Sequence, residues 1–282
     1  MPDNRLVAHH YTHGGLLEAI RAGVERMGKT PQTVSVQDLA AADEFHIGGR
    51  EATEAFLDQL GLSPENSVLD VGCGIGGSSR FVAERYGSRV TGIDLTEEFV
   101  ETGRALCAWV GLAERITLDQ GSATAMPYGE VSFDKAFMLH VGMNIPDKAG
   151  LFAELHRVLR PGGVLGVYDV MRIGEGDLSY PVPWATTAET NALARPEDYD
   201  RAMAEAGFEP VARRVRGEFA KAFFAQLQAR VSAAGGPPPL GLHILMGATA
   251  PAKIANMVEA IAADRVVPVE MIARKPASGA GR

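Results

Sequence analysis

Short apolar runs alternate along this chain with longer segments in which apolar residues recur at helical spacing. The short runs predict strands at residues 67–71, 89–93, 116–120, 133–139, 164–170, 210–215 and 267–273. The periodic segments between them predict helices at residues 78–86, 97–109, 148–158 and 196–206. Strands that alternate with helices are typical of a mainly parallel sheet covered by helices on both faces. We therefore expect an α/β fold, a doubly wound sheet of mainly seven strands.

Two helical additions accompany the predicted sheet. Residues 1–66 hold helical stretches near 16–27 and 51–60, and residues 218–264 are helical except for the segment GGPPPLG. These patterns predict a helical amino-terminal cap over 1–66, a cofactor-binding core over 67–217, a helical lid insertion over 218–264 and a last core strand within 265–276. The tail, 277–282, has a composition typical of disorder. Additions in these two places are arranged as a lid over a ligand pocket would be.

Glycines and acids at the ends of two predicted strands indicate a nucleoside cofactor. Residues 68–77 read VLDVGCGIGG, and the next apolar run ends at Asp94. A carboxylate at Asp70 would repel the pyrophosphate of a dinucleotide, whereas a helix N-terminus attracts it. The ammonium and sulfonium of S-adenosylmethionine instead favour nearby carboxylates. The pattern predicts an S-adenosylmethionine site and methyl transfer, although Gly72, Gly74 and Gly77 also fit the G-x-G-x-x-G pattern of dinucleotide sites.

Later segments carry a resemblance to a known family. VLDVGCGIGG resembles the glycine-rich motif of class I S-adenosylmethionine-dependent methyltransferases, and the resemblance extends to about Pro276. GSATAMPY (121–128), FDKAFMLHVGMNI (133–145) and LHRVLRPGGVLGVYDV (155–170) resemble that family's later motifs in the expected order, LRPGG being the most specific. The resemblance implies a Rossmann-like fold and S-adenosylmethionine as the cofactor. HVGMNIPDK (140–148) and DEFHIGG (43–49) together resemble small-molecule methyltransferases that act on sarcosine, dimethylglycine and phosphoethanolamine.

The candidate cofactor-binding residues follow the carboxyl ends of the strands, where open sheets place their ligands. Glycines allow the cofactor to approach the backbone, and Asp94 can accept both ribose hydroxyls, although it could also serve only as a helix cap. The resemblance places a small residue and an acid beside the adenine, but Ser122 stands here in place of the acid. The expected cofactor-binding residues are Asp70, Gly72, Gly74, Gly76, Asp94, Leu95, Ser122, Ala123 and His140.

Two residues are candidates for the chemistry. His140 ends the fourth predicted strand, and a histidine suits the removal of a proton from an amine or hydroxyl acceptor. It could equally serve only to hydrogen-bond the cofactor. In the resembling methyltransferases an amino-terminal tyrosine and a histidine after the fourth strand face the reacting centre, and Tyr11 and His140 are the matching residues here. Core packing of the Tyr11 ring is the alternative.

Substrate recognition is expected from the loops beyond the strands. Aromatic faces and the carboxylate of Asp169 would hold a cationic amine, although aromatic residues in the Pro-rich segment SYPVPW more often pack their own loop. His243 and Met246 could close the far wall from the lid. The expected substrate-binding residues are His46, Met143, Asn144, Tyr168, Tyr180 and Trp184.

Composition narrows the partners. A net charge of -8 argues against nucleic acid and favours a small-molecule substrate, because polyanions are bound by Lys and Arg. Two cysteines give no disulfide framework, and His9, His10 and His13 lack the spacing of a metal site, so we expect no metal. The chain has neither a long apolar run nor a signal-peptide pattern, which predicts a cytoplasmic protein without membrane attachment. A homodimer is left open.

The leading hypothesis is N-methylation of an amino acid or amine. O- or C-methylation of a metabolite or natural product, including an isoprenoid, is the alternative within the same class. A nicotinamide-dependent oxidoreductase and a non-catalytic nucleotide-binding protein are the alternatives from other classes, and the binding of S-adenosylhomocysteine or of NADH separates them.

Overall fold

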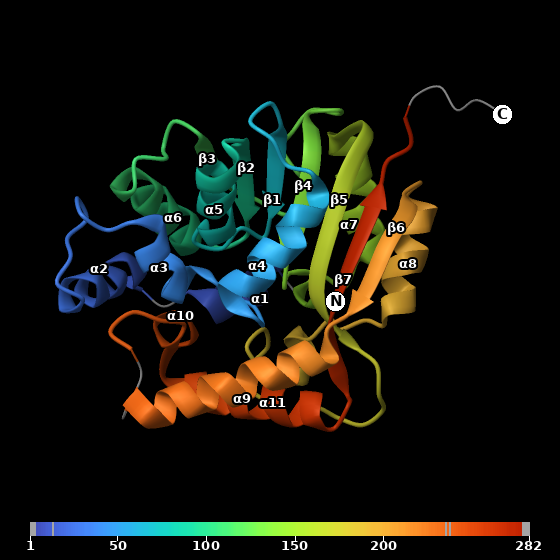
Figure 1. Ribbon diagram of the computed structural model, residues 1–282. Coiled ribbons are helices and arrows are strands. Elements are labelled where there is room, and N and C mark those ends of the chain that lie inside the picture. The colour runs from blue at the N-terminus through green and yellow to red at the C-terminus, as the bar shows by residue number, and fades with distance from the viewer. Residues whose placement is uncertain (1–3, 13, 235, 237, 278–282) are drawn as a thin grey trace.

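The computed structural model describes residues 4–12, 14–234, 236 and 238–277. Its centre is a seven-stranded sheet in the order β3-β2-β1-β4-β5-β7-β6 (Figure 1). The first five strands are parallel, and β7 runs antiparallel to both of its neighbours. The expected α/β, doubly wound fold is confirmed. The strands are β1 (Ser67–Val71), β2 (Arg89–Asp94), β3 (Ile116–Gln120), β4 (Phe133–Leu139), β5 (Leu159–Arg172), β6 (Glu209–Val215) and β7 (Val266–Arg274).

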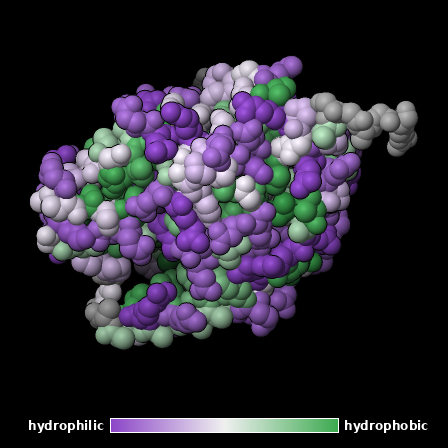
Figure 2. All heavy atoms as spheres, turned by 45° about the horizontal axis from the view of Figure 1, so that its top comes forward, coloured by the Kyte–Doolittle hydropathy of each residue, from purple (hydrophilic) through white to green (hydrophobic). Residues whose placement is uncertain are grey.

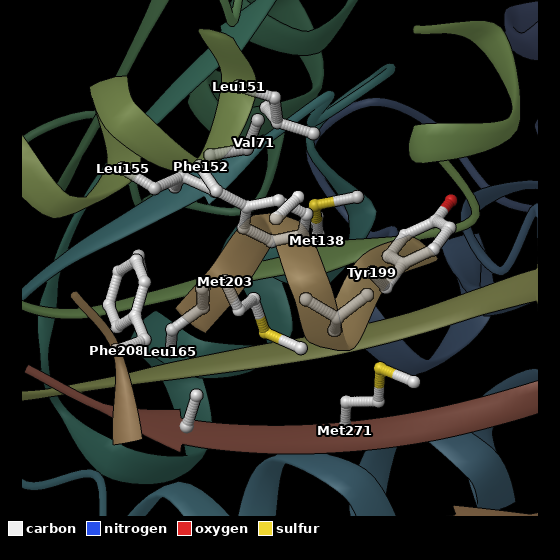
Figure 3. Packing of buried hydrophobic residues seen from close by; sticks show 14 of the residues in the cluster. Val71, Met138, Leu151, Phe152, Leu155, Leu165, Tyr199, Met203, Phe208 and Met271 are labelled. Carbon is white, nitrogen blue, oxygen red and sulfur yellow. The ribbon is translucent and has the colours of Figure 1, made fainter. Parts of the chain in front are cut away.

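Helices cover both faces of this sheet. On one face, α7 and α8 pack on Leu69, Met138 and Met271 in a buried cluster that Figure 3 shows from close by. On the other face, helices α4, α5 and α6 pack on side chains that include Val68 and Phe137. Because both faces are buried, the strands read as nearly continuous apolar runs in the sequence. These helices are α4 (Gly49–Leu57), α5 (Gly77–Tyr86), α6 (Glu97–Trp109), α7 (Lys148–Val158) and α8 (Pro196–Glu205).

The strand order reverses between β1 and β4. From β1 the chain moves outward through β2 to β3, and it then returns to place β4 on the opposite side of β1. A parallel sheet opens a crevice at the carboxyl ends of its strands where the order reverses. The glycine loop after β1 and the loop after β4 therefore face each other across that crevice.

The amino-terminal part differs from expectation by two short helices. The structure contains α1 (Asn4–Tyr11) and α3 (Val36–Asp43) in addition to α2 (Leu16–Arg26) and α4, and a 3-10 turn, η1 (Asp58–Leu60), ends the second expected stretch. Ser35 begins α3 with a reciprocal capping box to Asp38, a sequence signal that could have revealed this helix. The helix α1 spans only eight residues and depends on its contacts with the rest of the protein.

The carboxyl-terminal insertion is helical, as expected. It comprises α9 (Gly217–Ala234), α10 (His243–Met246), η4 (Gly247–Thr249) and α11 (Ala250–Ala262), which lie below the carboxyl ends of the strands in Figure 1. Phe224 in α9 and Met257 in α11 pack with Ile47 and Trp184 in a third buried cluster. The division of the chain into cap, core and lid stays a prediction, and the expected tail lies almost entirely outside the described residues.

The face shown in Figure 2 is mostly hydrophilic, with apolar residues scattered among polar ones. Within the described ranges, no helix combines the length and apolar character needed to cross a bilayer.

Candidate active site

A cavity of about 340 Å³ opens at the carboxyl ends of β1, β2 and β4. Its wall is built from α1, the segment before α4, the glycine loop, the ends of β2 and β3, the loop after β4, and one residue of α10. Elements from the cap, the core and the lid thus meet around one space. The lining includes Asn4, Val7, Tyr11, Asp43, Phe45, His46, Asp70, Gly72, Gly74, Asp94, Leu95, Ser122, Ala123, His140, Asn144, Asp147 and Leu245.

The glycine loop turns sharply and leaves room on its cavity side. Gly72 and Gly74 have φ values of 68° and 55°, in the left-handed region that favours glycine. A Cβ on Gly72 would lie 2.4 Å from the Val141 side chain, whereas one on Gly74 would meet nothing closer than 4.0 Å. Gly74 therefore preserves open space in the cavity. Gly76 does not line the cavity; it is the N-cap of α5 and packs beside Leu118.

Asp94 is anchored by two backbone amides. Its Oδ2 accepts a hydrogen bond from Gly74 N at 2.9 Å, and its Oδ1 accepts one from Thr96 N at 2.9 Å. The N-cap of the following helix is Thr96 rather than Asp94. Burial raises the pKa of Asp94. Each oxygen keeps a further lone pair, so the carboxylate is held rigidly and can still accept from a ligand.

Two more carboxyl groups lie deep in the cavity wall. Asp70 Oδ2 accepts from Ser79 Oγ at 2.6 Å, and burial raises its pKa to about 7. Asp43 is paired with the guanidinium of Arg80, but its Oδ2 is buried and has no hydrogen-bond partner among the described residues. Burial raises the pKa of Asp43 to about 6. An unpartnered carboxylate oxygen and ionisable acids in one wall suit a cationic ligand group.

The lining of the cavity as a whole is acidic. Asp147 joins Asp43, Asp70 and Asp94 in the lining, and no Lys or Arg occurs among the lining residues in the ranges that the structure covers. The ammonium and sulfonium of S-adenosylmethionine match this set of carboxylates, and a pyrophosphate does not. Ser122, Ala123 and Leu95 complete the wall beside the glycine loop, where Ser122 Oγ lies 3.0 Å from Thr124 Oγ1.

His140 lies at the end of β4 in an unusual backbone conformation. Its φ is 55°, and its amide donates to the Tyr168 carbonyl oxygen at 2.7 Å. Its Nε2 is buried and has no hydrogen-bond partner in the described part of the chain. Burial and the neighbouring His46 hold the pKa of His140 well below its ordinary value. His140 is therefore a neutral imidazole at physiological pH.

A polar cluster that the sequence reasoning missed supports His46. Its Nε2 lies 2.9 Å from Thr53 Oγ1, 3.3 Å from the Gly49 carbonyl oxygen and 3.4 Å from Glu44 Oε2. The rings of His46 and His140 have their centroids 5.9 Å apart. Burial lowers the pKa of His46 to about 4. The adjacent Gly48 and Gly49 indicated only a close approach of backbone, and nothing in the sequence singled out Glu44 or Thr53.

Tyr11 and Asn144 meet across the cavity. The Asn144 Nδ2 donates to Tyr11 Oη at 3.0 Å, and the Tyr11 ring packs beside Phe45 and Phe99. Burial raises the pKa of Tyr11, so that its hydroxyl keeps its proton. The structure thus brings together Tyr11, His46, His140 and Asn144, which the sequence reasoning had assigned to chemistry and substrate binding.

Four expected substrate-binding residues lie outside the lining. Tyr168 Oη donates to the Ile47 carbonyl oxygen at 3.0 Å behind the wall, and Met143 is buried in the third cluster. Trp184 Nε1 donates to Asn191 Oδ1, and Asn191 Nδ2 donates to Tyr180 Oη, at 3.0 and 2.8 Å. None of these four side chains lines the cavity, and Tyr180 and Trp184 pack their own loop, so direct contact of the four with a substrate stays a prediction.

Asp169, His243 and Met246, which were also considered for substrate binding, do not line the cavity either. Asp169 accepts from Gly142 N and Tyr199 Oη, both at 2.8 Å, and supports the loop after β4 from beneath. From α10, Leu245 lines the cavity instead of His243 or Met246. Across the residues described, no cluster of three or more His, Cys, Asp or Glu side chains could hold a metal, and His13 lies outside them.

Comparisons with known proteins agree with the site. Residues 68–163 match the family model described as a methyltransferase domain. The chain is 29% identical to methyltransferase GfsG of Streptomyces halstedii over 73% of each protein. It is 35% identical to phosphoethanolamine N-methyltransferase 1 of Arabidopsis thaliana, over 44% of this chain and 25% of that protein.

Solved structures share the fold at low sequence identity. A geranyl diphosphate methyltransferase in complex with GPP and sinefungin superposes with a TM-score of 0.71, 18% identity and coverage of 96% and 99% of the two chains. The [4+2]-cyclase SpnF superposes with a TM-score of 0.68, 22% identity and 98% coverage of both chains. The fold is thus shared by proteins named for different reactions. Together with the motifs, these likenesses support a class I S-adenosylmethionine-dependent methyltransferase.

Proposed function

We propose that this protein methylates a nitrogen atom of a small amine that carries no phosphate group. The observation that carries the proposal is the charge of the cavity wall. Four aspartates line it, and Lys and Arg are lacking from its described lining. Proteins that hold phosphate groups without a metal ion do so with Arg, Lys or clustered backbone amides, whereas carboxylates attract ammonium groups.

This acidic wall argues against the acceptors named for two of the similar proteins. The names of those relatives specify geranyl diphosphate and phosphoethanolamine, and both of these molecules are phosphorylated. A phosphate in this cavity would face Asp70, Asp94 and Asp147, and the described lining holds no Lys or Arg to offset them. An amine acceptor faces no such repulsion, because Asp147 and Asp43 favour its positive charge.

The residues of the chain can position both partners. S-adenosylmethionine supplies an electrophilic methyl group on a positively charged sulfur. Asp70 fits the ammonium of this cofactor, and Asp94 fits its ribose. The glycine loop leaves room for the part of the cofactor that lies against the backbone. Tyr11 and Phe45 line the cavity from the amino-terminal side, with their rings packed edge to face. Orientation and exclusion of water supply most of the rate in a displacement that disperses charge.

O-methylation of an apolar metabolite is the second candidate. Val7, Phe45 and Leu245 form an apolar part of the lining, which would suit a hydrocarbon chain or ring system that bears a hydroxyl group. Neutral histidines can accept a proton from a hydroxyl as well as from an amine.

A matched panel of acceptors tests the proposal. The protein is incubated with S-adenosylmethionine and with dimethylglycine, ethanolamine, phosphoethanolamine, geraniol and geranyl diphosphate, and methylated products are measured by mass spectrometry. We expect product from an unphosphorylated amine and none from the phosphorylated members. Product only from a phosphorylated acceptor would overturn the proposal, as would tight S-adenosylhomocysteine binding without methyl transfer across a broad amine panel. Product only from alcohols selects the second candidate.

A further inference from the structure

We propose that His46 is the residue that removes the proton from the methyl acceptor, with Thr53 and Glu44 orienting its ring. This inference rests on the proposed function, because a protonated amine or a hydroxyl acceptor must lose a proton before its electron pair can attack the methyl carbon. His46 lines the cavity, whereas Glu44 and Thr53 lie behind it, in the segment before α4 and in α4 itself.

The hydrogen bonds of Thr53 determine which nitrogen of His46 carries a proton. A hydroxyl has one proton to donate. The Thr53 hydroxyl donates to Glu44 Oε2 at 2.5 Å, so its 2.9 Å contact with His46 Nε2 must be one in which Thr53 accepts. His46 therefore carries its proton on Nε2. The Gly49 carbonyl oxygen, 3.3 Å from the same nitrogen, can only accept and supports the same tautomer.

Glu44 lies between the guanidinium of Arg50 and the hydroxyl of Thr53. Arg50 Nε lies 2.8 Å from Glu44 Oε1, and the Thr53 hydroxyl bonds the other oxygen. Burial raises the pKa of Glu44, and Arg50 and Thr53 limit that rise. The order of groups is then Arg50, Glu44, Thr53 and His46, with the imidazole facing the cavity at the end of the row.

The other nitrogen of His46 is available to a ligand. A neutral imidazole that is protonated on Nε2 has a lone pair on Nδ1. Nδ1 accepts no hydrogen bond from the part of the chain that the structure describes. It is also not fully buried, so a ligand can reach it. A lone pair on a cavity-lining ring, with the opposite nitrogen fixed, is the arrangement of a general base.

His140 is less suited to this task. The pKa of His140 is held well below its ordinary value, and that of His46 is lowered to about 4, so both rings are neutral. When His46 takes a proton, Glu44 lies 3.4 Å from its Nε2 and stabilises the imidazolium. Nothing comparable faces His140, whose Nε2 is buried without a described partner and whose ring lies against His46 and Tyr168. Burial and the charge of Arg50 oppose protonation of His46, and the Gly49 carbonyl oxygen favours it.

The proton transfer accounts for every atom and electron pair. The acceptor N–H or O–H bond breaks, and its proton passes to Nδ1 of His46. The electron pair that remains on the acceptor atom forms the new bond to the methyl carbon, with the pair of the carbon–sulfur bond left on sulfur. The imidazolium of His46 afterwards releases its proton to water when the products leave.

The tautomer gives a test that does not depend on activity. In ¹⁵N-labelled, ligand-free protein, long-range ¹⁵N–¹H spectra report which ring nitrogen carries the proton. We expect the protonated signal at Nε2 of His46, and its conversion to a mixture of tautomers in Thr53→Val. A wild-type ring protonated on Nδ1 would overturn the proposal, whether or not an acceptor has been found.

Kinetics with the acceptor that the panel identifies provide the second test. His46→Ala is expected to lower kcat about 10²- to 10⁴-fold while the Kd for S-adenosylhomocysteine changes less than about twofold. Glu44→Gln and Thr53→Val should lower kcat more than they raise KM, and Thr53→Ser, which keeps the hydroxyl, should recover most of the rate. His156→Ala in α7 and Glu51→Gln at the start of α4 are the matched controls outside the cavity.

The outcomes separate this inference from the proposed function. If the wild type methylates an amine and His46→Ala keeps its kcat within about threefold, His46 is not the base although the proposed function stands. If the wild type binds S-adenosylhomocysteine but methylates none of the acceptors, the proposed function fails. The ¹⁵N spectra then still test whether Thr53 and Glu44 orient the His46 ring. A melting curve close to wild type for each variant excludes loss of folding as the cause.

Discussion

Asn144 donates a hydrogen bond of 3.0 Å to the hydroxyl of Tyr11, and this contact joins the loop after β4 to the amino-terminal helix α1. The two residues lie 133 positions apart in the sequence. Asn144 Oδ1 is buried without a described hydrogen-bond partner, and the Tyr11 O–H donates to no described residue. The pair thus closes the cavity while presenting one free acceptor and one free donor to whatever it encloses.

Tyr11→Phe should weaken this closure without affecting the core. A neutral hydrogen bond contributes about 1 kcal/mol, so we expect kcat/KM to fall roughly five- to tenfold. The affinity for S-adenosylhomocysteine, measured by calorimetry, should change less than about twofold, because Asp70 and Asp94 do not depend on Tyr11. Tyr128→Phe, which removes a hydroxyl outside the cavity, is the control. Equal kinetics for the two variants would show that the contact does not contribute to closure.

Much of the core could be predicted from the sequence, because the period of its pattern is local. The structure has β1, β3, β4, α6 and α7 at the predicted bounds, since buried parallel strands and capped helices leave a signal in adjacent residues. β5 begins at Leu159, before its predicted start, because Leu159 pairs with Phe133 of β4, and Gly162 and Gly163 form backbone hydrogen bonds with the distant Lys275. That partner is remote in sequence, so no local pattern reveals it.

The residues of the site could be predicted where a local sequence motif fixes their position at the end of a strand. Asp70, Asp94 and the first two glycines line the cavity because strand ends and glycine turns fix their position. Trp184 and Tyr180 were assigned from their type alone, and their shared partner Asn191 turns them inward. The support of His46 by Thr53 depends on the rotation of α4 against the preceding segment, which composition and periodicity do not determine.

Asp94→Asn should selectively weaken cofactor binding. The substitution removes the charge and replaces one of the two oxygens, which accept separately from Gly74 N and Thr96 N, by a donor. Charged hydrogen bonds contribute about 1.5–3 kcal/mol, so the Kd for S-adenosylhomocysteine should rise about 10- to 150-fold. Asp119→Asn on β3, outside the cavity, controls for the loss of one charge. Unchanged binding in Asp94→Asn would remove this residue from the cofactor site.

Substitutions of His140 separate a backbone effect from a chemical one. With φ at 55°, the residue occupies a region that Asn tolerates and that costs Ala about 1 kcal/mol. We expect His140→Ala to unfold at a lower temperature than His140→Asn in a thermal melt. Because His46 is the proposed base, His140→Asn should keep kcat within about tenfold of wild type, whereas a base role for His140 itself would lower it by about two to four orders of magnitude.

Cofactor affinity should depend on pH through Asp70. Burial raises the pKa of this carboxyl from 3.8 to about 7 in the ligand-free protein. The ammonium of the cofactor favours the ionised form, so binding below pH 7 must release a proton. The Kd for S-adenosylhomocysteine is therefore expected to fall about tenfold per pH unit as the pH rises toward 7, and to level off above it. Calorimetry in two buffers of different ionisation enthalpy measures the released proton directly.

Asp70→Asn provides the counterpart of this experiment. The variant should bind more weakly than wild type above pH 7, with a Kd that no longer changes steeply with pH. The raised pKa also means that the folded, ligand-free protein binds more protons than the unfolded chain between about pH 4 and 7. The stability from this group is thus present below pH 4 and is lost as the pH rises through 7, and Asp70→Asn should flatten that decline in denaturant titrations. An unaltered pH dependence of binding in Asp70→Asn would place the coupled proton elsewhere, with Asp43 the next group to test.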